Sequence, residues 1–224
     1  MFRNNSILGN TPPVVKNLLL VNIIVYLITM LTGNFMYEHF ALYYFESPLF
    51  KPLQLVTHMF MHGGFTHIFF NMYTLYIFGC VLERVWGDKK FLIYYFATGF
   101  GAALLHLGVM YLQLQGYLAE ANEGNMYATA KIQQLLLTPT VGASGAIYGL
   151  LMAYGILFPN NIMQLIFPPV ALKAKWFVLI FGALELLLGV SGSGGNVAHF
   201  AHLGGMIFGY LLLMYWKKNN RMYY

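Results

Sequence analysis

Six apolar stretches constrain this chain more than any other feature of its sequence. They run roughly over residues 18–33, 65–82, 91–113, 144–158, 176–190 and 199–216. Several come near the ~20 residues that a membrane-spanning helix needs, and two are shorter. Charged residues make up only 8% of the 224 residues, whereas a typical soluble domain carries about 25%. Because lipid offers no partner to exposed backbone groups, these stretches predict an all-α fold class.

The stretches predict a polytopic membrane protein that forms one domain over residues 1–224, with six transmembrane helices. With the N-terminus inside, the outer segments carry only Lys51 and Lys131. The inner segments hold ten basic residues, namely Arg3, Lys16, Arg84, Lys89, Lys90, Lys173, Lys175, Lys217, Lys218 and Arg221. This positive-inside bias predicts that both termini are cytoplasmic. It also accounts for the net charge of +5 without a nucleic-acid partner.

The remaining segments add expectations about targeting and loops. The first apolar run begins only after Lys16 and no cleavage-type site follows it, which favours a retained helix over a signal peptide. We expect a multi-pass protein of a bacterial plasma (inner) membrane. Cys80 is the single cysteine, so no internal disulfide is predicted. Residues 34–64, rich in aromatic rings, and the polar residues 114–143 are expected to form long outer loops.

Polar residues stand at the same end of three of the apolar stretches. With alternating orientation, the second, fourth and sixth stretches begin on the outer side, near His67, Ser144 and His202 respectively. Polar side chains are costly inside a membrane, and their presence there usually marks a functional site. His67 also shares a helix face with Asn71, four residues later. The sequence therefore predicts that these side chains meet at one depth.

Small residues predict which helices approach most closely. The fourth and sixth stretches each carry two glycines four positions apart: Gly145 with Gly149, and Gly205 with Gly209. Such pairs let helix backbones pack together in lipid. Because His202 shares a face with its glycine pair, close packing of these two helices would place Ser144 beside His202.

This predicted arrangement suits nucleophilic catalysis. A serine hydroxyl needs a neighbouring base to accept its proton, which makes His202 the natural base for Ser144. The backbone N–H groups at the start of the helix, with His67 and Asn71, would stabilise an oxyanion. No aspartate is placed to orient His202, so the sequence predicts a dyad. Tyr148, one turn after Ser144, is expected to pack against the imidazole.

At these positions the chain resembles the rhomboid family of intramembrane serine proteases. The matching strings are His58-x3-His62-Gly63-Gly64-x2-His67-x3-Asn71, Gly142-Ala143-Ser144-Gly145-x2-Tyr148 and Ala201-His202-x2-Gly205-x3-Gly209. The resemblance implies the minimal six-helix bundle, a Ser144–His202 dyad, an oxyanion hole formed by the Ser144 amide, His67 and Asn71, and stacking of Tyr148 on His202. One departure concerns the first outer loop. Where many members carry a Trp-Arg pair that anchors it, this chain has Leu53-Gln54.

Metal binding is the alternative interpretation of the histidines. His58, His62 and His67 are possible ligands, as are His199 and His202, but the sequence does not join them to a carboxylate or thiol that would complete a zinc sphere. His58 and His62 are instead expected to hold the junction between loop and helix by hydrogen bonds, and His199 to lie in a loop or cap a helix. We therefore predict no metal and no other cofactor.

Glu185 is the one acid within an apolar stretch. A charge at mid-membrane costs on the order of 2.5–3.5 kcal/mol on insertion scales. The predicted dyad gives Glu185 no partner, so a structural role is favoured over a catalytic one.

The resemblance implies an enzyme that cleaves transmembrane or juxtamembrane segments of membrane proteins near the extracytoplasmic face. Its predicted partners are the lipid bilayer and single-pass or other membrane-protein substrates, and the sequence does not indicate an oligomeric state. Two other classes stay open, an inactive rhomboid-like binding protein and a polytopic metal or solute transporter. The intact Ser144 and His202 argue against the first. The absence of paired intramembrane charges argues against the second.

Overall fold

Helices dominate the structure, a computed structural model that describes residues 10–164, 169–191 and 196–219. Within these residues, five helical segments are long and apolar enough to cross a membrane: Pro13–Thr32, Phe65–Trp86, Asp88–Asn122, Ala174–Ser191 and Ala198–Lys218. A further apolar helix, α8 (Ser144–Leu157), has 14 residues. The predicted helical class with several apolar membrane-type helices is confirmed. Each of the five long segments corresponds to a predicted stretch, with ends that differ by up to nine residues.

The bundle is built from α1 (Pro13–Thr32), α4 (Phe65–Thr74), α5 (Cys80–Trp86), α6 (Asp88–Asn122), α8, α9 (Ala174–Ser191) and α10 (Asn196–Lys218). A π-helical turn over Leu75–Gly79 joins α4 to α5, so the second apolar stretch is one continuous helical segment. Such turns widen a helix locally by one residue. The β-ribbon between α8 and α9 pairs β1 (Ile162–Gln164) with β2 (Ala171–Lys173) in antiparallel register, Met163 opposite Leu172.

The expected outer loops contain helices. The first holds α2 (Asn34–Phe40), α3 (Gln54–Thr57) and a 3₁₀ turn, η2 (His58–Phe60). The long loop expected over residues 114–143 is largely helical, because α6 continues to Asn122 and α7 occupies Met126–Leu137. The Asn125 side chain accepts a hydrogen bond from the backbone N–H of Tyr127 at 3.0 Å and so caps the start of α7. The polar composition thus reflects exposed helix surface.

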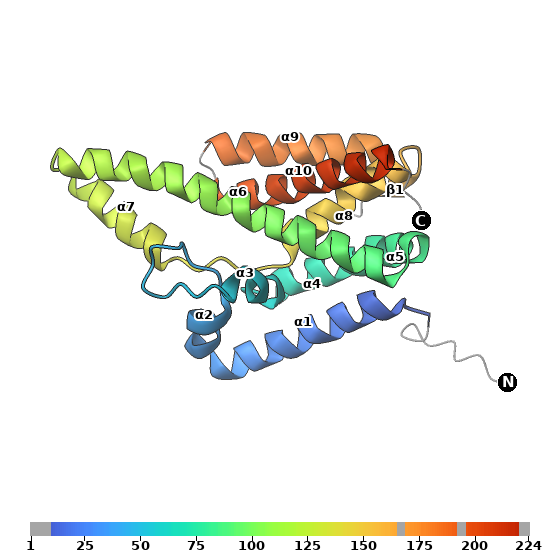
Figure 1. Ribbon diagram of the computed structural model, residues 1–224, viewed down its shortest axis with the longest axis horizontal. Coiled ribbons are helices and arrows are strands. Elements are labelled where there is room, and N and C mark those ends of the chain that lie inside the picture. The colour runs from blue at the N-terminus through green and yellow to red at the C-terminus, as the bar shows by residue number, and fades with distance from the viewer. Residues whose placement is uncertain (1–9, 165–168, 192–195, 220–224) are drawn as a thin grey trace.

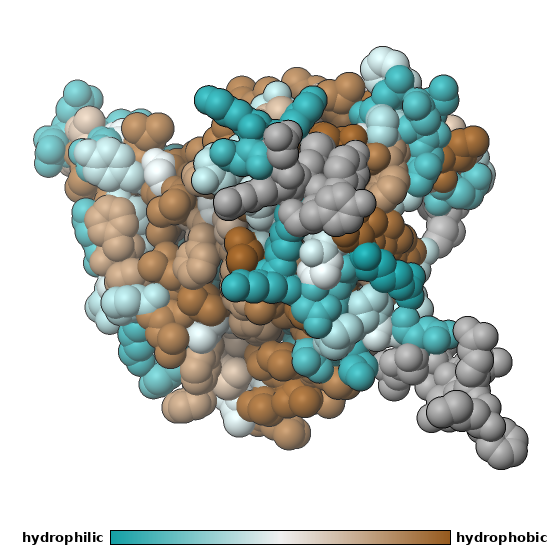
Figure 2. Space-filling view, turned by 45° about the vertical axis from the view of Figure 1, so that its right-hand side comes forward, coloured by the Kyte–Doolittle hydropathy of each residue, from teal (hydrophilic) through white to brown (hydrophobic). Residues whose placement is uncertain are grey.

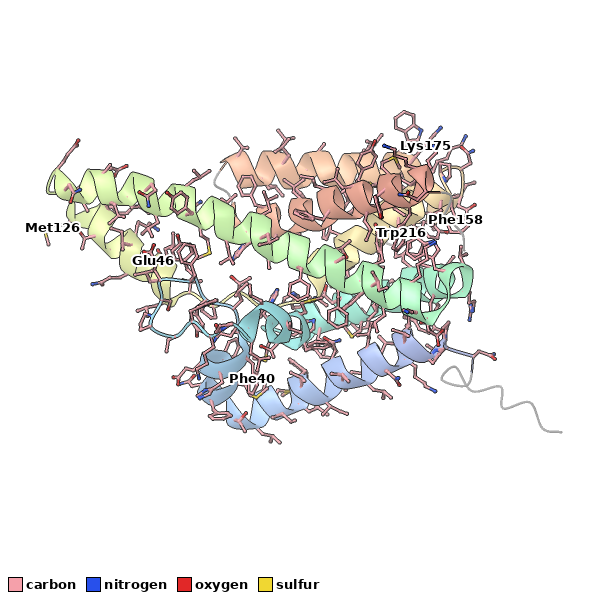
Figure 3. The ribbon with its side chains drawn as sticks, in the orientation of Figure 1. Phe40, Glu46, Met126, Phe158, Lys175 and Trp216 are labelled. Atoms are coloured by element: carbon pink, nitrogen blue, oxygen red, sulfur yellow. The ribbon has the colours of Figure 1, made fainter. Side chains whose placement is uncertain are left out.

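The helices lie roughly along one long axis of the molecule (Figure 1). The tip of α6 and α7 projects at one end, on the same side as α2, and the start of α1 and the end of α10 lie at the other end. The labelled residues follow this division, with Met126 and Glu46 toward the first end and Lys175, Phe158 and Trp216 at the second (Figure 3). The starts of α4, α8 and α10 point toward the end that holds α2 and α7 (Figure 1).

The outer surface of the helices is strongly apolar. Leu31 on α1 is 86% exposed, and Leu112 on α6 is 69% exposed. Hydrophobic residues cover the flanks of the molecule, and hydrophilic residues gather toward its ends (Figure 2). An apolar surface of this extent is incompatible with bulk water and fits contact with lipid chains.

Glycines set the contact between α8 and α10. A Cβ atom on Gly205 would overlap the carbonyl oxygen of Gly145, and one on Gly209 would lie 3.3 Å from the Cα atom of Gly149. The two glycine pairs identified in the sequence therefore face each other across this contact. On its other side, Gly145 packs against Ala102 of α6, so a third helix closes over the same small surface. This packing fixes the N-terminal part of α8 against the middle of α10.

Buried Glu83 joins the first helix to the bundle. Its carboxylate oxygens accept hydrogen bonds from the backbone N–H groups of Val14 at 2.8 Å and Val15 at 2.7 Å. These N–H groups belong to the first turn of α1, where no helical carbonyl is available to them. A carboxylate at this position also interacts favourably with the helix dipole. The contact explains why an acid is only 2% exposed.

Gln54 anchors the first outer segment. Its Oε1 atom accepts from the backbone N–H groups of Lys51 at 3.0 Å and Tyr43 at 3.4 Å. Its Nε2 atom donates to the backbone carbonyls of Leu49 at 2.9 Å and Glu38 at 3.3 Å. The side chain is fully buried. Four backbone groups from separate parts of the segment thus converge on one amide.

Replacing Gln54 with methionine is expected to lower the thermal midpoint of unfolding. Methionine has a similar shape but leaves four buried backbone groups without their partner, and each unsatisfied group costs about 1–3 kcal/mol before local relaxation. We expect a total loss of about 2–4 kcal/mol, measured by thermal unfolding in detergent. Leu53→Ala is the matched control, because Leu53 is 61% exposed. An unchanged midpoint for Gln54→Met would show that the segment is held by other contacts.

Candidate active site

Ser144, at the start of α8, and His202, in the N-terminal part of α10, lie in hydrogen-bond contact. Ser144 is the first residue of α8, and its Oγ atom is 2.9 Å from His202 Nε2. Both side chains are partly buried. The glycine contact between the two helices brings them together, since it sets the height and rotation of α10 against α8. A hydroxyl at this distance from an imidazole nitrogen can pass its proton to the ring.

Tyr148 lies flat against His202. The two ring centroids are 4.2 Å apart and the planes differ by 5°. Tyr148 is one turn after Ser144 on α8, so the helix presents the hydroxyl and the stacking ring to the same imidazole. The stack restricts rotation of the imidazole and keeps Nε2 directed at the Ser144 hydroxyl.

His67 reaches the same region from α4, and Asn71 lies one turn later on that helix. His67 Nδ1 accepts a hydrogen bond from the backbone N–H of Gly63 at 3.4 Å, so the neutral ring carries its proton on Nε2. A Cβ atom on Gly142 would lie only 2.9 Å from that Nε2 atom, and Gly142 has a φ of +131°. Only glycine fits there without strain. Asn71 Nδ2 is buried and has no hydrogen-bond partner among the described residues.

A small cavity opens beside Ser144 and is lined in part by His58, His106 and Thr140. His58 Nδ1 donates to the backbone carbonyl of Gln54 at 2.8 Å, which confirms the expected junction contact for this residue. The backbone carbonyl of His58 accepts from Gly142 N at 2.9 Å and ties the first outer segment to the turn before Ser144. Burial lowers the pKa of His58 to about 4, so its ring is neutral at neutral pH.

The expectation for His62 is wrong in its detail. Neither ring nitrogen of His62 has a hydrogen-bond partner within the part of the chain that the structure describes. The ring packs edge-on against His67, with centroids 5.0 Å apart. Burial first, and then the neighbouring His67, lower the pKa of His62 to about 4. His62 therefore supports His67 by packing as a neutral ring.

Glu185 lies beside Tyr148 and His202 in the candidate active site, a position that the sequence did not predict. From α9 its carboxylate accepts hydrogen bonds from the Tyr148 hydroxyl at Oε1 and from His199 Nδ1 at Oε2, the latter at 2.6 Å. Its Oε1 atom is also 3.1 Å from His202 Nδ1. As the one acid within a predicted apolar stretch, Glu185 was a visible signal in the sequence. What the sequence lacked was the rotation of α9, which decides that Glu185 faces α10 and α8 instead of lipid.

The same contacts bear on the metal interpretation. His199 lies within α10, not in a loop, and the argument that no carboxylate joins the histidines is wrong for His199 and His202, because Glu185 lies between them. Ligand-type atoms of these three residues lie within 4.8 Å of one another. Hydrogen-bond donors nevertheless engage both carboxylate oxygens of Glu185. As it stands, the group is a hydrogen-bonded network and not an open set of ligands.

Residues 50–219 match the family model described as the Rhomboid domain. The chain belongs to the rhomboid family. It is 28% identical to Rhomboid protease AarA of Providencia stuartii over 69% of this chain and 52% of AarA. It is also 28% identical to Putative rhomboid protease YdcA of Bacillus subtilis (strain 168), over 75% of this chain and 70% of YdcA. Rhomboid protease GlpG of Yersinia pseudotuberculosis is 24% identical over 93% of this chain and 64% of GlpG.

The chain thus spans about half the length of AarA and about two thirds of YdcA and GlpG. Family membership and the five long apolar helices together identify an integral, multi-pass membrane protein. The rhomboid assignment from the motif strings is confirmed by the family match, which covers all three strings.

Proposed function

We propose that this rhomboid is an intramembrane serine endopeptidase in which Ser144 is the nucleophile and His202 the general base. The observation that carries the proposal is the 2.9 Å contact between Ser144 Oγ and His202 Nε2 on two packed helices. Its substrates are single-pass or other membrane proteins. They are cleaved within or beside a transmembrane segment, near the extracytoplasmic face.

The reaction follows from the positions of these atoms. As Ser144 Oγ forms a bond to the substrate carbonyl carbon, its proton moves to His202 Nε2. Collapse of the tetrahedral intermediate breaks the peptide C–N bond, and the leaving amine takes the proton from Nε2. Water then attacks the acyl-enzyme and gives a proton to His202 Nε2; as the bond between the acyl carbon and Ser144 Oγ breaks, Oγ takes that proton back and the carboxyl product is released. These reaction steps need no cofactor.

The oxyanion is held by groups that surround Ser144. Its backbone N–H lies at the first residue of α8, where helix N–H groups lack intrahelical acceptors and the helix dipole favours negative charge. His67 Nε2 and Asn71 Nδ2 supply donors from α4. The unpaired, buried state of Asn71 Nδ2 supports this role, because a buried amide donor without a partner is costly unless the reaction uses it.

The proposed domain covers residues 1–224 and crosses a bacterial inner membrane six times, with both termini cytoplasmic. In this arrangement α8 is the fourth of the six spans. Its 14 residues extend roughly 21 Å at ~1.5 Å per residue, against a ~30 Å hydrocarbon core. A helix this short is tolerated because α6, α9 and α10 surround it. We propose that Ser144 lies below the outer surface of the bilayer and that α9 is the lateral gate for a substrate helix.

Labelling with a fluorophosphonate probe tests the proposed function. The probe reacts with a serine only when a base activates its hydroxyl, so we expect one modified site, Ser144, identified by mass spectrometry. Cleavage of a single-span model substrate in liposomes should accompany labelling and resist a chelator. An inactive rhomboid-like binding protein would bind the substrate without either reaction. A metal or solute transporter would show neither reaction and would move its solute across the liposome membrane.

Substituting alanine for His67 or Asn71 is expected to weaken cleavage without abolishing it. The loss of one oxyanion donor costs on the order of 10²–10³ in kcat, and the remaining donors can reduce that penalty here. Because the hydrogen bonds form mainly to the transition state, kcat should fall while KM changes little. Steady-state kinetics on the model substrate measure both. A change confined to KM in both variants would assign these residues to substrate binding or helix packing instead.

A further inference from the structure

Glu185 completes the hydrogen-bonded chain that begins at the Ser144 hydroxyl. We infer that Glu185 is a positioning residue for the proposed base: it holds His202 Nδ1 and thereby directs Nε2 at Ser144, so the site works as a Ser-His-Glu arrangement. The inference rests on the proposed function, because it assigns a partner to the base of that reaction. It differs from the dyad that the sequence predicts.

The two nitrogens of the His202 ring face different partners. Nε2 is 2.9 Å from Ser144 Oγ, and Nδ1 is 3.1 Å from Glu185 Oε1. The Nδ1 contact is within ion-pair distance but is not aligned as a hydrogen bond. Contacts of this kind are often poorly aligned in free enzymes and tighten in the substrate complex. A carboxylate at Nδ1 favours the tautomer with its proton there, which leaves the Nε2 lone pair free to accept the serine proton.

The carboxylate is itself held in a fixed orientation. The Tyr148 hydroxyl donates to Oε1 and His199 Nδ1 donates to Oε2, so each oxygen acts as an acceptor, as in an ionised carboxylate. Glu185 is 7% exposed and is drawn from α9, whereas its donors come from α8 and α10. Two donors from two helices therefore fix the same group that approaches Nδ1.

Tyr148 joins both parts of this arrangement. Its ring stacks on His202, and its hydroxyl binds Glu185, so one side chain sets the plane of the imidazole and the position of the acid. A purely structural acid would need only its two donors. The placement of Oε1 against His202 Nδ1 adds a negative charge where the imidazolium forms during the reaction, which lowers the energy of that intermediate relative to the resting state.

Glu185→Gln in the full-length protein is the decisive variant, because glutamine keeps the size and hydrogen-bonding capacity but removes the charge. Losing the acid costs on the order of 10⁴ in kcat in soluble triads; the Tyr148 stack retains part of the orientation, so we expect a loss of about 10–10²-fold in kcat with KM changed by less than about twofold. The rate of fluorophosphonate labelling should fall in parallel, since it reports activation of Ser144 without a transmembrane substrate.

Two further variants separate positioning from folding. Tyr148→Phe keeps the stack and removes the hydroxyl that orients Glu185, and should lower kcat by about three- to tenfold with KM unchanged. Val178→Ala is the matched structural control, because Val178 is a buried α9 residue that packs on Gly155 of α8 without any polar contact to the site. It should lower the thermal midpoint and leave the labelling rate within about twofold of wild type.

The outcomes are distinct. Wild-type kcat and labelling in Glu185→Gln, or an effect on KM alone, would overturn the inference. If Glu185→Gln does not fold, wild-type kcat in Tyr148→Phe would overturn it just as clearly. Ser144→Ala tests the proposed function separately: an inactive Ser144→Ala beside a normal Glu185→Gln removes only the role of Glu185, whereas an active Ser144→Ala removes the function itself.

Discussion

Ser144→Ala is expected to abolish proteolysis while the protein remains folded and inserted. Removing the serine of a soluble triad costs roughly 10⁶ in kcat, because no other group can form the acyl-enzyme. Alanine removes a single oxygen from a partly buried side chain at the first turn of α8, so the packing of α8 against α6 and α10 is preserved. Cleavage of a single-span substrate reconstituted in liposomes measures the loss.

The control for this variant is its thermal midpoint in detergent, which should match that of wild type within a few degrees. Fluorophosphonate labelling of Ser144→Ala should also be absent. Substantial residual cleavage by a folded Ser144→Ala protein would rule out Ser144 as the nucleophile.

His202→Ala should approach the same severity, and comparison with His199→Ala makes the assignment specific. Both histidines lie on α10 and both approach Glu185, but only His202 Nε2 contacts Ser144. In soluble proteases, loss of the base costs about as much as loss of the nucleophile. His199→Ala removes one donor to the carboxylate and should lower kcat by less than about tenfold.

Kinetics of the two variants on the same substrate, with labelling rates, provide the measurement. If His199→Ala were the inactive protein and His202→Ala the active one, the base would be misassigned. Each variant serves as the matched control for the other, since the two residues are one turn apart on the same helix.

Much of this arrangement could be predicted because its determinants are local. Long apolar runs require helices in lipid. The helical spacing of His67 with Asn71, and of His202 with its glycine pair, places these side chains on defined faces. The short strings around Ser144 and His202 were specific enough to indicate the rhomboid family, which the family match confirmed.

Other features depended on contacts between distant segments. The polar residues after position 113 read as a loop, yet α6 extends to Asn122 because a helix outside lipid tolerates a polar surface. The four backbone partners of Gln54 come from positions 38 to 51, and no local pattern in the sequence signals that they converge.

Glu185 shows most clearly the difference between what the sequence predicts and what only the tertiary structure decides. The sequence by itself determined that an acid lies within an apolar helix, that Ser144 and His202 lie near the starts of two apolar stretches, and that small residues let those helices touch. Only the tertiary structure decided that α9 turns Glu185 toward Tyr148, His199 and His202. The physical reason is that helical periodicity fixes which residues share a face, whereas the rotation of one helix against its neighbours is set by side-chain packing along the whole contact.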